Sequence, residues 1–314
     1  MNTQTFTETL RDLQLGEMKW NFALYSAQKS RDGLELDWNI CKMKNIAGQV
    51  ETIKTTLLEK TIAEKAVAEY SPFLSYKENL AAIERTDDLI KDKITDILLN
   101  IQNGLTYAPE DFVSGVLPKI TGYGFYGEMK NAEGQLIQAL FMKRGNPFLA
   151  GQKVNLCTTV GDEVVTSENP VLKFTAAVDF IFVGGVCYFN STPIEKDFDI
   201  ENRDFVIAAK RMDRIAESEI VSDYEQLEKA VMSSKNARKF IDFDNEILER
   251  IKKLGVMDRQ EFLLTYGINI DDRNGCIDTS DPEQCELVID FLCSRVCIDP
   301  HGRLATGSNI TPRE

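Results

Sequence analysis

The first third of the chain changes from a strand-type to a helix-type hydrophobic pattern. Residues 18–29 and 34–43 alternate apolar and polar positions around Arg31–Gly33, which predicts an opening hairpin. From Asn45 to about Glu69, and again from Thr86 to Gln102, the apolar spacing becomes helical. The second helical segment gathers one apolar stripe, made of Leu89, Ile90, Ile94, Ile97, Leu98 and Ile101. We therefore expect an N-terminal region of strands and helices.

Alternating patterns return in the middle of the chain. The predicted strands are 117–129, 135–143, 152–158 and 163–166. The clearest pattern covers 171–190, where apolar positions alternate on both sides of Gly184-Gly185. Because tight hairpin turns need positive φ at their central residues, this glycine pair predicts a hairpin.

The last part of the chain reads as mostly helical. Helical spacing covers 199–254, and an apolar segment at 287–293 precedes a polar end. Together the patterns predict an α+β protein with mixed and antiparallel sheets, hairpins and a helical C-terminal region. We place the domain boundary near residue 110, between a strand–helix region (1–110) and an α+β domain (111–314).

Composition limits the class of protein. The chain has 314 residues, of which 43% are hydrophobic and 27% charged, as is typical of a soluble globular protein. Its start lacks the apolar segment of a signal peptide, and its seven cysteines are scattered, so we expect a cytoplasmic protein with reduced thiols. The net charge of −14 argues against indiscriminate binding to nucleic acid or anionic membranes. The window 203–259, by contrast, holds equal numbers of basic and acidic residues.

Two familiar motifs are matched only in part. GYGFYG (122–127) fits GxGxxG, a pattern that holds pyrophosphate when it lies between a strand and a helix N-terminus. Here a turn and another strand follow, so we interpret the glycines as part of a bulged strand. In INIDDRNGCIDTSDPEQCE, aligning Gly275 with the invariant glycine of a calcium loop puts Ile270 at the first ligand position. We therefore expect no cofactor at either segment.

The C-terminal region contains soft metal ligands. Cys293, Cys297 and the single histidine, His301, are spaced by four residues and could bind zinc. The spacing differs from the usual CxxC knuckle, and Cys293 lies in an apolar run, where thiols behave as small hydrophobes. Buried thiols are therefore the main expectation and a structural zinc the alternative. With one histidine, in a polar tail, we assign no catalytic residue.

The helix predicted at 202–217 is amphipathic in an unusual way. At 100° per residue, Arg203, Lys210 and Arg214 fall on one side, and Arg211 flanks and widens this row. The opposite side is a core-facing stripe of Phe205, Ala208, Ala209, Met212, Ile215 and Ala216. Aligned cations at helical spacing suit a phosphate backbone.

A second group of cations follows on the next predicted helix, at Lys235, Arg238 and Lys239, with Arg250, Lys252 and Lys253 near its end. Both groups also fit a simpler interpretation, in which they form solvated helix faces and compensate helix dipoles.

A metal-dependent nuclease is the alternative activity. Restriction-type nucleases place an acid on one strand and E-x-K on the next, and Asp179 followed by Glu195-Lys196 is similar in order. Glu195 and Lys196 are adjacent, however, and adjacent residues of a strand point to opposite faces. Glu195 and Lys196 therefore cannot share one metal site on a strand. Because this motif varies and the metal chemistry needs few residues, the nuclease remains the alternative, with Asp179 and Glu195 as its candidate ligands.

One family shares the order of these features over about residues 170–310. The segments concerned are LKFTAAVDFIFVGGVCYFNSTPIEKDFDI, the amphipathic helix, SDYEQLEKAV, SKNARKFIDF and VIDFLCSRVCIDPHGRLATGSNI. In these segments the chain resembles the KwaB-like family, the soluble component of the two-gene Kiwa anti-phage system of bacteria. The N-terminal half has a compatible length and few diagnostic features.

The resemblance implies a cytoplasmic DNA-binding effector that forms a homodimer or higher assembly. It would act beside a membrane partner, KwaA, and block the replication and transcription of phage DNA. The resemblance transfers no DNA-contacting residues, so we take them from the charge geometry: Arg203, Lys210, Arg211, Arg214, Lys235, Arg238 and Lys239. A scaffold that binds a partner without binding DNA is the third possibility.

Overall fold

The protein folds into two units, each described here by itself. The computed structural model describes residues 8, 10, 11, 13, 17–30, 33–41, 47–84, 88–103, 119–130, 134–147, 157–160, 163–166, 173–175, 177–271, 274–298 and 304–306. The sheet unit comprises Met1–Tyr70 and Ser75–Asp199, and the helical unit comprises Ser71–Leu74 and Ile200–Glu314. The boundary expected near residue 110 falls outside the described residues. Strands from before and after it belong to one sheet, and the chain divides after Asp199 instead.

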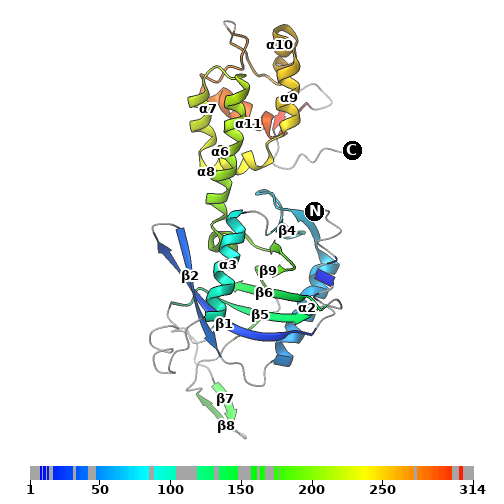
Figure 1. Cartoon of the computed structure of the whole chain (residues 1–314), viewed down its shortest axis with the longest axis vertical. Coiled ribbons are helices and arrows are strands. Elements are labelled where there is room, and N and C mark those ends of the chain that lie inside the picture. Colours follow the sequence, from blue (N-terminus) through cyan, green and yellow to red (C-terminus); the bar gives the residue numbers. More distant parts are fainter. Residues whose placement is uncertain are drawn as a thin grey trace. The chain divides into compact units, whose positions relative to one another are not determined.

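The sheet unit is built on an eight-stranded mixed sheet (Figure 1). In spatial order its strands are β2 (Gly33–Cys41), β1 (Lys19–Ser30), β5 (Gly122–Lys130), β6 (Leu136–Arg144), β9 (Phe180–Val183), β10 (Val186–Phe189), β4 (Asn79–Glu84) and β3 (Ala66–Glu69). All neighbours are antiparallel except β3 and β4. Two short pairs lie outside this sheet, β7 (Cys157–Val160) with β8 (Glu163–Thr166) and β11 (Val296–Ile298) with β12 (Leu304–Thr306). The α+β class is confirmed.

Both hairpins expected from glycine-containing turns are present. β1 and β2 pair in register from Phe22–Cys41 to Ser30–Gly33. β9 and β10 turn at Gly184 and Gly185, whose φ angles of 58° and 82° are readily adopted by glycine. This second hairpin is shorter than the predicted 171–190, because the strands cover only 180–183 and 186–189.

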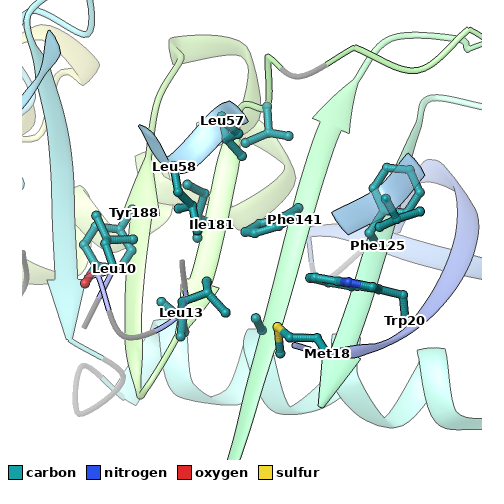
Figure 2. Close-up of a cluster of buried hydrophobic side chains, with 14 of the residues drawn as sticks. Leu10, Leu13, Met18, Trp20, Leu57, Leu58, Phe125, Phe141, Ile181 and Tyr188 are labelled. Carbon is teal, nitrogen blue, oxygen red and sulfur yellow. The ribbon is translucent and has the colours of Figure 1, made fainter. Parts of the chain in front are cut away.

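Large apolar side chains fill one face of the sheet. Leu57 and Leu58 come from α2 (Ala47–Glu64) and belong to the same buried cluster as the sheet residues. Figure 2 shows them with the sheet side chains Trp20, Phe125, Phe141, Ile181 and Tyr188. The other predicted helix, α3 (Asp88–Asn103), contacts β2 and buries Ile90, Ile94, Ile97, Leu98 and Ile101. The predicted stripe of this helix therefore faces the core.

The glycines of GYGFYG lie in a regular strand. β5 pairs without a shift in register to β1 on one side and β6 on the other, so the expected bulge is absent. A Cβ at Gly127 would lie 2.7 Å from the indole ring of Trp20. Glycine is required here because an aromatic ring from the neighbouring strand covers the backbone.

The predicted helix at 45–69 ends early. α2 stops at Glu64, and 66–69 form β3, which pairs in parallel with β4. The N–H of Ala66 donates to the carbonyl of Glu78, and Val67 is buried, so sheet pairing decides the conformation of this segment. β4 was not expected from the sequence.

The described part of the helical unit is mainly helical, and four of its helices have side-chain caps. The α-helices of this part are α6 (Ile200–Ser218), α7 (Tyr224–Val231), α8 (Ser234–Lys239), α9 (Asn245–Lys253), α10 (Val256–Leu264) and α11 (Pro282–Leu292). The side chains of Asp223, Ser233, Asp244 and Asp281 accept hydrogen bonds from the N–H groups of the first turns of α7, α8, α9 and α11. The caps at Asp223, Ser233 and Asp244 divide the predicted helical region 199–254. The apolar faces of the helices share one core.

Candidate nucleic-acid interface

Helix α6 has a buried side and an exposed side, as the amphipathic pattern predicts. Its buried residues are Ile200, Asp204, Ala208, Met212 and Ile215. From the predicted apolar stripe, Phe205 and Ala209 are half-buried and Ala216 is exposed. The buried side thus includes the carboxylate of Asp204, which the predicted apolar stripe did not contain.

Two of the predicted cations are exposed on α6. Lys210 and Arg214 are four residues apart, so they lie on the same side of the helix one turn from each other. The guanidinium of Arg214 donates a hydrogen bond from Nη1 to Oδ1 of Asn245, the first residue of α9, at 2.7 Å. This contact orients Arg214 while leaving the residue exposed.

Two other predicted cations face a buried carboxylate. Asp204 is 1% exposed, and its oxygens lie 3.6 Å from Nη1 of Arg203 and 3.8 Å from Nε of Arg238. Arg238, on α8, also donates to the carbonyl of Pro72 at 3.4 Å. Since a buried carboxylate is costly without cations around it, Arg203 and Arg238 stabilise the interior of the helical unit.

Arg211 turns away from the exposed row that we expected it to widen. Its guanidinium donates to the carbonyl of Phe240, and burial lowers the pKa of this guanidinium below its ordinary value. The arginine therefore attaches α6 to the 3-10 turn η4 (Phe240–Asp242).

The two lysines of α8 also differ in exposure, since one is buried and the other exposed. The ammonium of Lys239 lies 2.7 Å from Oδ1 of Asp290 and 3.2 Å from Oε2 of Glu286, and its side chain is only 10% exposed. Lys235 reaches Glu286 at 3.5 Å with a side chain that is 72% exposed. Lys239 thus links α8 to α11, whereas Lys235 extends into solvent.

Helix α9 adds further exposed cations. Arg250, Lys252 and Lys253 are exposed, and the ammonium of Lys252 lies 3.0 Å from Oε1 of Glu249. A shallow hollow of about 510 Å³ opens on this helix. It is lined by Asn245, Glu246, Glu249, Arg250, Lys253 and Leu254.

Of the seven predicted phosphate contacts, the structure leaves three exposed: Lys210, Arg214 and Lys235. Of the other four, Arg211, Arg238 and Lys239 connect their helices to other elements, and Arg203 pairs with Asp204 on its own helix. The acidic partners that the sequence pattern did not reveal are Asp204 and, on α11, Glu286 and Asp290. A signal for Asp204 was present, because it precedes Ala208, Met212 and Ile215 at helical spacing and so belongs to the buried stripe.

The candidate nuclease ligands lie in the sheet unit and accept protein hydrogen bonds. Asp179 accepts from Nζ of Lys143 at 2.9 Å and from the N–H of Arg144 at 2.8 Å. Glu195 accepts from the hydroxyl of Tyr76 at 2.5 Å. Glu195 ends α5 (Thr192–Glu195) and is not on a strand, so our argument from strand faces does not apply to it. Across the described residues, no three His, Cys, Asp or Glu side chains are grouped to hold a metal ion.

The predicted cysteine cluster is described only in part. Cys293 is buried, and burial raises the pKa of its thiol to about 12, which keeps it protonated at neutral pH. Cys297 is half-buried on β11, and His301 lies outside the described residues. Cys285 is also buried and donates to the carbonyl of Thr279. Cys285 and Cys293 therefore behave as buried thiols.

Comparison with protein-family models, with curated proteins and with solved structures finds no match to this chain. In the described part of the chain, no helix combines the length and the apolar character that crossing a membrane requires.

Proposed function

We propose that this protein is an antiviral effector that binds DNA largely independently of sequence and blocks replication and transcription of phage DNA. The observation that carries the proposal is the exposed pair Lys210 and Arg214 on the outer side of α6. Lys235 and the exposed cations of α9 add further positive charge to the surface of the helical unit. Each cation that neutralises a phosphate releases a counterion, which drives binding to any sequence.

A small footprint agrees with the acidity of the chain. The net charge of −14 lies outside the window 203–259, which is neutral overall, so contact with a DNA duplex is disfavoured least within that window. Arg203, Arg211, Arg238 and Lys239 are engaged inside the helical unit. Of the seven cations predicted from the sequence to contact phosphates, we therefore retain Lys210, Arg214 and Lys235.

The cellular role rests on the resemblance to the KwaB-like family. That resemblance supports a cytoplasmic homodimer or higher assembly recruited to the inner membrane through the membrane protein KwaA. Phage DNA is then the ligand, and the membrane contact belongs to the partner.

The test is binding of the purified chain to duplex DNA of two unrelated sequences across a salt series. We expect similar affinities for both sequences and a steep loss of affinity with salt. In the double variant Lys210→Glu/Arg214→Glu, binding should weaken for both sequences. The log–log salt slope should fall by about 1 for each lost phosphate contact.

The control is Lys229→Glu, an exposed lysine of α7 outside the proposed footprint. Unchanged affinity in the double variant, or an equal loss in the control, would reject the Lys210–Arg214 site. Absence of binding at low salt would favour a protein scaffold. Magnesium-dependent loss of intact DNA that Asp179→Asn abolishes would favour the nuclease.

A further inference from the structure

The hollow on α9 differs in character from the charged surface around it. Its lining is mostly apolar, although four of the six residues that line it are charged, namely Glu246, Glu249, Arg250 and Lys253. The long hydrocarbon parts of such side chains can cover apolar surface while their charged ends stay in water. Leu254 is half-buried at the end of α9. An apolar hollow whose lining residues include the cations Arg250 and Lys253 suits a flat, mostly apolar ligand whose anionic attachment lies beside these cations and away from Glu246 and Glu249.

The guanidinium of one lining residue, Arg250, lies over an aromatic ring. The guanidinium carbon of Arg250 lies 4.4 Å from the ring centroid of Phe262 on α10, and Arg250 itself is exposed. The ring of Phe262 therefore contacts one side of the guanidinium. Guanidinium planes supported in this way are common stacking partners of unpaired nucleobases.

The hollow is also connected to the proposed phosphate contacts. Asn245 lines the hollow and accepts the hydrogen bond from Arg214. Immediately after Leu254 and Gly255, α10 begins with Val256 and Met257, whose exposed fractions are 54% and 84%. Cations, a hollow and exposed apolar side chains thus occur together on α6, α9 and α10.

We infer that the α9 hollow takes an unstacked nucleobase, with its backbone phosphates on Arg214 and Lys210. The preferred ligand is then single-stranded or locally unpaired DNA. This inference rests on the proposed DNA binding and adds which form of DNA the site selects. Cations alone would retain a backbone of any form, whereas a stacking surface needs a base that has left its duplex.

The experiment compares an oligothymidylate, an abasic oligonucleotide of the same length and a duplex, each titrated with the full chain at one salt concentration. We expect the oligothymidylate to bind about tenfold more tightly than the abasic strand, because one or more bases stack. Arg250→Lys keeps the positive charge and removes the planar guanidinium. It should therefore lower the ratio of the affinities for the oligothymidylate and the abasic strand toward one. Lys252→Gln, on the same helix, removes a positive charge but no planar group, so it should weaken the binding of both strands equally.

Leu254→Ser provides a second variant in case Arg250→Lys perturbs the packing of Phe262, and thermal unfolding is measured for both. Equal binding of the normal and abasic strands by the wild type would overturn the inference. An unchanged ratio of the two affinities in both Arg250→Lys and Leu254→Ser would overturn it as well. The hollow would then suit an apolar protein segment instead of a base. In either case, persistent duplex binding leaves the proposed function standing. Failure of the wild type to bind any of the three nucleic acids would reject the proposed function together with this inference.

Discussion

The hydroxyl of Tyr25 donates a hydrogen bond of 2.9 Å to Oδ2 of Asp197, a carboxylate with no solvent exposure. Tyr25 is on β1 and Asp197 is in the 3-10 turn η3 (Lys196–Phe198), so the bond joins segments that are 172 residues apart. Nη1 of Arg144 lies 3.4 Å from the other oxygen of Asp197. Burial nevertheless raises the pKa of Asp197 above its ordinary value, against the lowering effects of Tyr25 and Arg144.

This raised pKa sets the pH dependence of Asp197→Asn. A carboxyl whose pKa is higher in the folded state stabilises the fold when protonated, and that stabilisation is lost as pH rises through the folded-state pKa. Asparagine stays neutral, so the variant should gain stability relative to wild type as pH rises from near 3.8 toward neutrality. Urea unfolding at several pH values measures the difference. A relative loss with rising pH would mean that the pair with Arg144 outweighs burial.

In the helical unit, the buried carboxylate of Asp204 allows a second prediction about the stability of the fold. Asp204→Ala leaves Arg203 and Arg238 without the carboxylate that both face, and should lower the free energy of unfolding by about 3 kcal/mol. The matched control is Asp213→Ala, an exposed acid on the same helix, which should change stability by less than about 0.5 kcal/mol. Chemical denaturation of the two variants provides the comparison, and equal midpoints would contradict the buried role of Asp204.

Local signals were sufficient for much of the fold. The glycine pair at 184–185 and the turn before Gly33 predicted two hairpins, because positive φ and alternating apolar positions are properties of the neighbouring residues alone. The apolar stripe of α3 was equally local. β3 was missed because its four residues become a strand only by pairing with β4, whose distance along the chain no local pattern encodes.

The candidate site was predictable only in part, for a related reason. Periodicity placed Lys210 and Arg214 on the exposed side of α6, and they are exposed. It could not show that Arg203 and Arg238 would both lie beside a buried Asp204, or that Lys239 would meet Asp290. Arg238 reaches Asp204 from another helix, α8, and Lys239 reaches Asp290 on α11, so the number of cations left for a ligand depends on tertiary packing.

The glycine-rich strand β5 allows a test of packing in the sheet unit. Gly127→Ala would place a methyl group 2.7 Å from the ring of Trp20 and should destabilise the fold by about 1–3 kcal/mol. Gly48→Ala is the control, because no atom lies within 4 Å of the added Cβ and the position is in α2. That variant should be unchanged or more stable by up to about 1 kcal/mol. Thermal unfolding of both decides whether the close approach of Trp20 is what requires glycine.

Two lysines on α8 separate support of the fold from binding of DNA. Lys239→Gln removes the ammonium from between Asp290 and Glu286, and should lower the free energy of unfolding by about 2 kcal/mol while leaving the salt slope of DNA binding unchanged. Lys235→Gln should have the opposite profile, with stability within about 0.5 kcal/mol of wild type and a salt slope reduced by about 1.

Denaturation and DNA titrations on the same two preparations test this pair of variants. Both lysines reach Glu286, so the loss of that one ion pair is common to the two and cannot explain a difference between them. If Lys239→Gln lowered the salt slope while remaining fully stable, the buried lysine would be a phosphate contact after all. The division of cations by exposure would then be wrong.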